Sequence, residues 1–175
     1  MYSNPSDFNT PNLMKITSLP LPLPLPPRTP TEQSRDLELA WCAGMFDGDG
    51  CVFISRQKMA GRKNRTYRLV LSLVQNCNVT ADHFRATLGL PHCLVAVRRS
   101  VSHNRQIYDV RYDGVHALTA LRLMEPFLVR KRIEAVAARQ FWKECRMGVL
   151  PGPKGLPPEV WRNRERYYWK LHNLK

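Results

Sequence analysis

Hydrophobic and polar positions alternate most cleanly over residues 66–75, and this period of two predicts a β-strand. One side of the predicted strand carries three leucines: Leu69, Leu71 and Leu73. The other side carries Arg68, Val70 and Ser72. We therefore expect one face to enter a core and the other to carry polar groups suited to reading a surface. A second strand is predicted over 51–57, joined to the first by the basic turn "AGRKNR".

Before and after these strands, apolar residues recur at helical spacing. A helix is predicted over 36–46, with Ser34 as its N-cap and with Gly48 and Gly50 ending it. The helix places Leu37, Ala40, Trp41 and Gly44 on one side. Further helices are predicted over 79–88, from 114 to near Pro126, over 130–147 and over 159–171, with strands at 94–100 and 106–113. This order predicts an α+β fold built from antiparallel hairpins.

The chain divides into three parts. Residues 1–33 include an alternation of Leu and Pro from 19 to 26, which predicts an extended, disordered Pro-rich tail. Residues 34–147 hold the predicted strands and most helices, and form the expected domain. Residues 148–175 contain the linker "PGPKGLPP" and a basic, aromatic helix, for which packing on the domain is favoured over DNA contact.

Charge narrows the class of partner. The 175 residues include 27 Lys and Arg against 14 Asp and Glu, a net charge of +13 that favours a polyanion such as nucleic acid. The five cysteines include no CxxC pair, which argues against a zinc site or a disulfide framework and favours an intracellular, reduced protein. No run is long enough to span a membrane, and no secretory signal is present. A transit peptide to a chloroplast or mitochondrion stays open.

One stretch departs from this basic character. In "AWCAGMFDGDG", residues 40–50, two acids lie at the end of an apolar helix. Gly48 and Gly50 allow a sharp turn and leave the Asp49 carboxylate unobstructed. That carboxylate and the bare Gly48 carbonyl are hard oxygen donors suited to Mg²⁺, with Mn²⁺ as an alternative. On these residues alone, a helix-ending turn without metal is the competing interpretation.

Small residues on the same helix suggest how a metal site could be completed. Ala40, Ala43 and Gly44 lie three and four residues apart, and a face of small residues lets two helix backbones approach closely. If two such helices pack together, two Asp49 side chains come near each other. The pair would give a shared metal site for phosphodiester hydrolysis.

The stretch "CAGMFDGDGCVFI" resembles the motif of the LAGLIDADG homing endonucleases, L-A-G-Φ-Φ-D-G-D-G followed by a strand, where Φ is apolar. Cys42 stands where the family has its first leucine. The resemblance covers residues 36–145 and implies an αββαββα domain with a four-stranded antiparallel DNA-binding sheet, here with extra C-terminal helices. Asp113-Gly114 lacks a preceding small-residue helix, so there is one motif. A single motif implies a homodimer and a near-palindromic DNA site.

By resemblance, the activity is a site-specific, metal-dependent double-strand DNA endonuclease encoded in an intron. Asp49 resembles the essential metal ligand, assisted by the Gly48 carbonyl. Gln75 resembles the residue that organises water near the metals, and Lys131 resembles the lysine of the catalytic site. Asp47 resembles the family's conserved acid with a structural, helix-ending role. The resemblance implies a dimer interface formed by Ala40, Ala43, Gly44 and Asp47. Asn76 and Asn78 compete with Gln75 for its role, and Arg130 and Arg132 compete with Lys131.

The resemblance also makes the sheet the DNA-reading surface. The candidate side chains on the strands are Ser55, Gln57, Thr66, Arg68, Ser72, Arg98, Ser100, Asp109 and Arg111. In the first turn, Arg62, Lys63 and Arg65 are expected to hold phosphate rather than to read bases. For each arginine the alternative is a solvated charge.

Two other function classes stay open. Members of the same fold bind intron RNA as maturases or bind DNA without cutting it. A basic structural protein of a nucleoprotein particle would explain the charge but not the motif. The presence of Asp49, Gln75 and Lys131 together favours cleavage. A protein that only binds nucleic acid has no need to keep the two motif carboxylates, Asp47 and Asp49, against a phosphate backbone.

Overall fold

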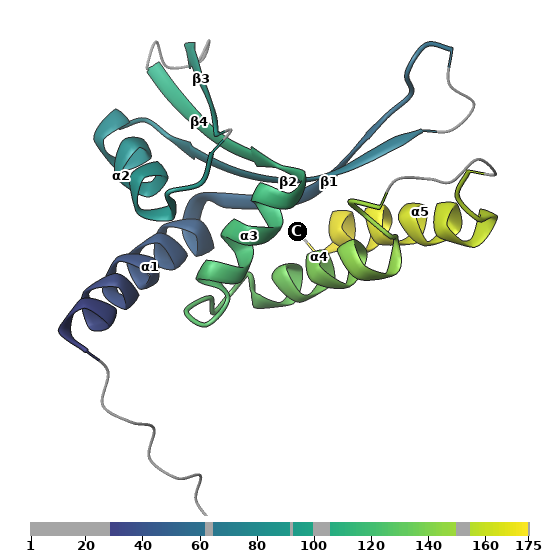
Figure 1. Ribbon diagram of the computed structural model, residues 1–175. Coiled ribbons are helices and arrows are strands. Elements are labelled where there is room, and N and C mark those ends of the chain that lie inside the picture. Colours follow the sequence, from purple (N-terminus) through teal and green to yellow (C-terminus); the bar gives the residue numbers. More distant parts are fainter. Residues whose placement is uncertain (1–28, 62–64, 92, 100–105, 150–154, 175) are drawn as a thin grey trace, which may run out of the picture.

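The computed structural model describes residues 29–61, 65–91, 93–99, 106–149 and 155–174 (Figure 1). The first part of the chain forms α1 (Pro30–Asp49), β1 (Gly50–Gln57), β2 (Thr66–Gln75), α2 (Asn78–Leu88), β3 (Leu94–Arg99) and β4 (Gln106–Asp113). The second part forms α3 (Gly114–Met124), α4 (Arg132–Glu144) and α5 (Pro158–Asn173). The predicted α+β order is confirmed. The predicted tail up to residue 28 lies outside the described residues.

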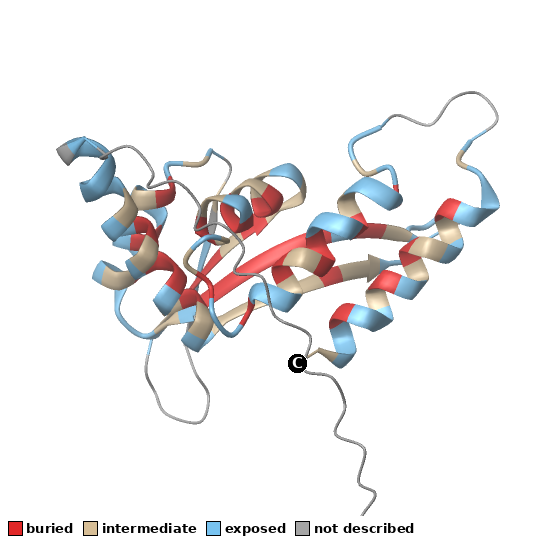
Figure 2. Ribbon diagram, turned by 90° about the horizontal axis from the view of Figure 1, so that it is seen from below, coloured by how far each residue is buried: buried red, intermediate tan, exposed pale blue. Residues whose placement is uncertain are grey.

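The four strands make one antiparallel sheet in the order β1-β2-β4-β3, so β2 and β4 are central. Among the described elements, the helices gather on one face of this sheet and leave the other face open (Figure 1). The three leucines of β2 (Leu69, Leu71 and Leu73) are fully buried on the helix side, as the alternation predicts. Figure 2 shows buried residues along the strands and on the helix sides that face them. Among the described helices, none covers the open face.

Helix α1 starts earlier than the sequence analysis predicts. Thr29 is its N-cap: the Glu32 backbone N–H donates to Thr29 Oγ1 at 3.3 Å, and the Thr29 backbone N–H donates to Glu32 Oε2 at 2.8 Å. Pro30 occupies the first helical position, where its missing N–H needs no partner. The prediction of Ser34 as N-cap is wrong, because the capping box begins the helix further upstream, at Thr29.

The C-terminal helix α5 packs against α4 and β1. Arg56 and Tyr67, which pair across β1 and β2, both donate hydrogen bonds to Glu165 of α5. The Arg56 guanidinium also lies 4.2 Å from the ring centroid of Tyr168. These contacts fasten α5 to the helix side of the sheet. No helix among the described residues is long and apolar enough to cross a membrane.

The predicted helices at 114 to near Pro126 and at 130–147 are shorter in the structure, at Gly114–Met124 and Arg132–Glu144. The chain between them turns, and its backbone N–H groups at Val129, Arg130 and Lys131 are bound by a side chain of α1 rather than by helical carbonyls. This turn brings residues 129–131 to the end of α1.

Candidate functional site

The α1–β1 junction is a direct change from helix to strand at Gly50. A Cβ atom on Gly50 would lie 2.1 Å from Cδ2 of Phe46 and 2.5 Å from the Phe46 carbonyl oxygen, so only glycine fits. The ring of Phe46 is fully buried and holds the junction against the core. Asp49, the last residue of α1, is exposed immediately beside this fixed point.

Gln75 is the polar side chain that meets Asp49. Its Nε2 donates to Asp49 Oδ2 at 2.7 Å. The contact follows from the strand register, because Gly50 pairs with Leu73 and so brings the end of β2 to the start of β1. Asn76 and Asn78 are exposed, and neither bonds Asp49 among the described residues. Of the three candidates that the sequence offers, Gln75 is the one in contact.

Asp47 ties α1 to the segment before α4. Its Oδ2 accepts hydrogen bonds from the backbone N–H groups of Val129 at 2.7 Å and Arg130 at 3.1 Å, and its Oδ1 accepts from Lys131 at 2.8 Å. Burial alone would raise the pKa of Asp47, but the three N–H donors and the charge of Lys131 outweigh it and lower that pKa. The charged carboxylate is therefore part of the folded structure.

We expect Asp47→Asn to lower the free energy of unfolding by about 2 kcal/mol at pH 7, because an amide cannot accept all three N–H bonds as a carboxylate does. A lowered folded pKa contributes stability above the unfolded value of about 3.9, and this contribution is lost as pH falls through the folded value. The difference between variant and wild type should therefore shrink below about pH 4.

Urea unfolding of both proteins at a series of pH values from neutral to acid checks this expectation. Asp82→Asn is the matched control, since the ion pair that Asp82 makes with Arg85 is exposed and no other side chain in the described ranges bonds it. A difference between Asp47→Asn and wild type that stays constant across the whole pH range would contradict the role of the charge.

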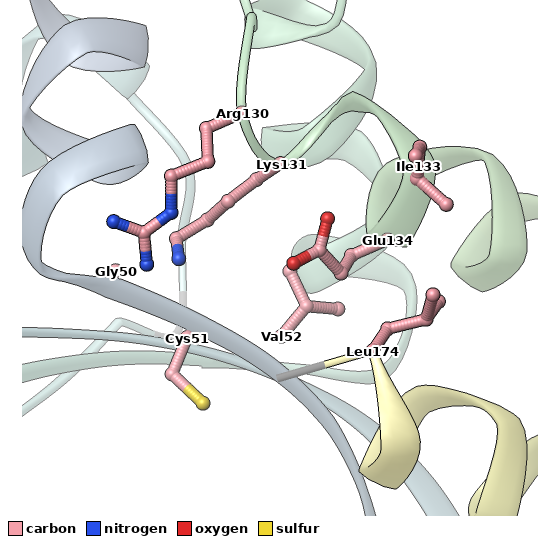
Figure 3. A pocket seen from close by; sticks show the side chains of 8 residues that line it. All are labelled: Gly50, Cys51, Val52, Arg130, Lys131, Ile133, Glu134 and Leu174. Atoms are coloured by element: carbon pink, nitrogen blue, oxygen red, sulfur yellow. The ribbon is translucent and has the colours of Figure 1, made fainter.

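A pocket of about 360 Å³ opens beside the junction. Its lining consists of Gly50, Cys51, Val52, Arg130, Lys131, Ile133, Glu134 and Leu174. Figure 3 shows the side chains of Arg130 and Lys131 extending from the chain before α4 toward Gly50. Lys131 is only 6% exposed, whereas Arg132 is exposed and does not line the pocket. Both Arg130 and Lys131 thus reach the site, and Arg132 does not.

Glu134 is a pocket residue that the sequence analysis missed. Its carboxylate faces the pocket from the first turn of α4 (Figure 3). The signal was its spacing of three from Lys131, which places both residues on one side of a helix start. The pocket therefore holds one acid near two cations.

The DNA-reading candidates on the open face of the sheet differ in their exposure to solvent. Gln57, Arg65 and Arg68 are exposed, and Ser55, Thr66 and Arg111 are half-buried. Ser72 is buried, and its hydroxyl donates to Asp109 at 2.6 Å, so the expectation that it meets DNA directly is wrong. Its place on a central strand explains this, because β1 and β4 flank it on both sides. The side chain of Arg98 and the whole of Arg62, Lys63 and Ser100 lie outside the described residues.

The small-residue face of α1 is only partly available to a second copy. Ala43 is fully buried in the core of its own chain with Leu39, Cys42 and Phe46, so its assignment to a dimer interface is wrong. Ala40 and Asp47 are half-buried, and Gly44 is exposed. The exposed side of α1 also carries two apolar residues that the interface prediction left out: Leu37 and Trp41.

No protein-family model matches the chain, and no curated protein matches its sequence. Solved structures do match. The homing endonuclease I-CvuI, solved with the I-CreI target in the presence of Mg with the DNA not cleaved, is 23% identical, with a TM-score of 0.64 over 81% of this chain and 84% of its own.

Two further solved structures extend the likeness. The archaeal intron-encoded homing endonuclease I-Vdi141I, complexed with DNA, is 14% identical, with a TM-score of 0.59 over 80% of this chain and 85% of its own. The I-LtrWI LAGLIDADG homing endonuclease, bound to target DNA, is 12% identical, with a TM-score of 0.55 over 78% of this chain and 44% of its own. The described part of the chain has the fold of the LAGLIDADG homing endonucleases.

Proposed function

We propose that this protein is an intron-encoded, site-specific endonuclease that cuts both strands of a near-palindromic DNA site, as a metal-dependent homodimer. The observation that carries the proposal is the contact between Gln75 Nε2 and Asp49 Oδ2 beside a pocket that holds Lys131. The sequence motif led to the expectation of these three residues together. The fold of solved homing endonucleases supports the same class of reaction.

The donor groups at the junction fit a divalent metal ion in part. Among the described residues, no three His, Cys, Asp or Glu side chains cluster as a metal site. One chain therefore offers Asp49 and the Gly48 carbonyl, both exposed, with open space around Gly48. Mg²⁺ needs only one or two carboxylates, with waters and substrate phosphate for the rest. Two copies of Asp49, one from each protomer, would supply the two carboxylates for Mg²⁺ or Mn²⁺.

A bound metal would supply Lewis acidity and a lowered water pKa. The chain's own residues do the rest. Gln75 fixes the Asp49 carboxylate through its amide N–H. Lys131, which is nearly buried, and the exposed Arg130 offer positive charge at the pocket, where it would stabilise negative charge developing on a phosphate. Asp47 holds the backbone of Lys131 against the end of α1, so acid and cation keep one relative position.

Two surfaces of the molecule suit the proposed partners, a second copy of the chain and duplex DNA. The exposed side of α1 presents Leu37 and Trp41 next to Gly44, and a bare glycine lets a second helix come close. A dimer across this helix would bring two α1 ends, and so two Asp49 residues, together. The open face of the sheet and the net charge of +13 suit a duplex lying across both copies.

Cleavage of a partly randomised palindromic DNA library tests the proposal. We expect cuts at one family of sequences in Mg²⁺ or Mn²⁺ and none in EDTA. Sequencing of the products gives the site. Selective binding to one DNA sequence without cuts would replace the proposal with a non-cleaving binder. Binding to intron RNA in place of DNA would replace it with a maturase.

A further inference from the structure

A buried acid lies on the open face of the sheet, opposite the face that carries the helices. Asp109 of β4 is 3% exposed. Its Oδ1 accepts a hydrogen bond from Ser72 Oγ at 2.6 Å, and its Oδ2 accepts one from Arg111 Nη2 at 3.0 Å. A buried carboxylate is costly unless it is paired and hydrogen-bonded, and these two groups meet that requirement. The cluster joins the two central strands, because Ser72 pairs directly with Arg111.

The same contacts fix the guanidinium of Arg111. Its Nη2 is held by Asp109, and its Nε is buried without a hydrogen-bond partner in the described structure. The side chain is nevertheless 42% exposed. Within the described residues, Nη1 has no protein acceptor, and Nη2 keeps a second N–H. One N–H of Nη2 and both N–H groups of Nη1 are thus left for an outside acceptor pair.

A second Arg–Asp pair on this face is built differently. Arg68 Nη1 donates to Asp113 Oδ2 at 3.1 Å across β2 and β4. Here the arginine side chain is 60% exposed and the acid 31%, against 4% for the acid beside Arg111. An exposed pair of this kind is weak and lets the arginine move. Arg111 is therefore the more rigidly held of the two.

We propose that Arg111 reads a guanine in the DNA site, and that Asp109 and Ser72 are positioning residues that set its guanidinium for this contact. The inference rests on the proposed function, since it requires duplex DNA on the open face. Guanine presents two acceptors in the major groove, O6 and N7, which match the two terminal nitrogens of an arginine. A guanidinium already fixed loses little side-chain entropy on binding. The adjacent carboxylate disfavours a phosphate, which would bring a second negative charge to the same arginine.

The test is the base preference of DNA binding, measured in EDTA on the full chain with a randomised palindromic library. Wild type should prefer guanine at one position of each half-site. Arg111→Ala should reduce that preference by roughly 10- to 100-fold and leave other positions unchanged. Asp109→Asn and Ser72→Ala should each weaken preference at the same position, by roughly threefold to tenfold.

Two comparisons separate positioning from plain folding. Ser72→Ala keeps the charges of both partners, so it serves if Asp109→Asn unfolds. Asp113→Asn is the matched control and should leave the position read by Arg111 unchanged. If Arg111→Ala keeps the guanine preference, or if Asp109→Asn and Ser72→Ala both leave it intact, the inference is overturned. A wild-type protein that prefers no sequence overturns the proposed function as well, and this outcome is visible before any variant is made.

Discussion

The Asp49→Asn variant is expected to lose DNA cleavage by roughly a thousandfold or more while it keeps its affinity for the target. Asparagine preserves the shape of the side chain and can still meet the Gln75 amide. It removes the negative charge on which a divalent cation depends at this position. Asp49 is exposed at the end of α1, so the fold should not change.

Cleavage rates and binding affinities should be measured on the same palindromic substrate. Loss of a negative charge near a polyanion should leave affinity equal or slightly higher. Asp82→Asn is a suitable control, because it removes an exposed acid on α2 whose ion pair with Arg85 is itself exposed. An Asp49→Asn protein that cuts at the wild-type rate would remove Asp49 from the chemistry.

The Gly50→Ala variant is expected to lose about 3 kcal/mol of unfolding free energy, because the methyl group has no room. It would lie 2.1 Å from Cδ2 of Phe46, whose ring is fully buried, and 2.5 Å from a backbone oxygen that cannot swing aside. A loss of this size corresponds to a melting temperature lower by roughly 6 to 12 °C. Cleavage should fall as well, since the clash displaces Asp49.

Thermal and urea unfolding check the effect, with Gly48→Ala as the matched variant. A methyl group on Gly48 meets nothing within 4 Å in its own chain, and alanine is the better helix former by about 1 kcal/mol. Repeating both variants at several protein concentrations separates loss of a dimer from loss of the fold. Equal stability of Gly50→Ala and wild type would mean that the junction can open at little cost.

The strands were predictable because period two is a local pattern. β2 has the predicted bounds of Thr66–Gln75, and its leucines are buried as expected. The start of α1 was missed although its signal is also local. Thr29 and Glu32 form a capping box around Pro30, but the preceding prolines suggested a tail that continued past them.

Some features of the candidate site could likewise be predicted from the sequence, and others could not. Asp49 and Gln75 were proposed from the motif, and the structure brings them into contact. The burial of Ser72 depends on which strands become its neighbours, and the sequence of β2 does not contain that information. Ala43 faces the core for a similar reason, since the helix pattern alone does not tell which small residues a sheet will cover.

Because α5 packs on one face of β1, the residues on that face should tolerate substitution poorly, and the residues on the other face should tolerate it well. On one side, Ile54 is buried and Arg56 is held by Glu165. On the other, Ser55 and Gln57 face away from the helices and take no part in this packing. If the proposed function holds, retargeting the protein to a new DNA sequence would therefore start from Ser55 and Gln57. We expect a library that varies these two residues to change recognition, while the buried residues of β1 and the acids of α1, which directly precede β1, stay as they are.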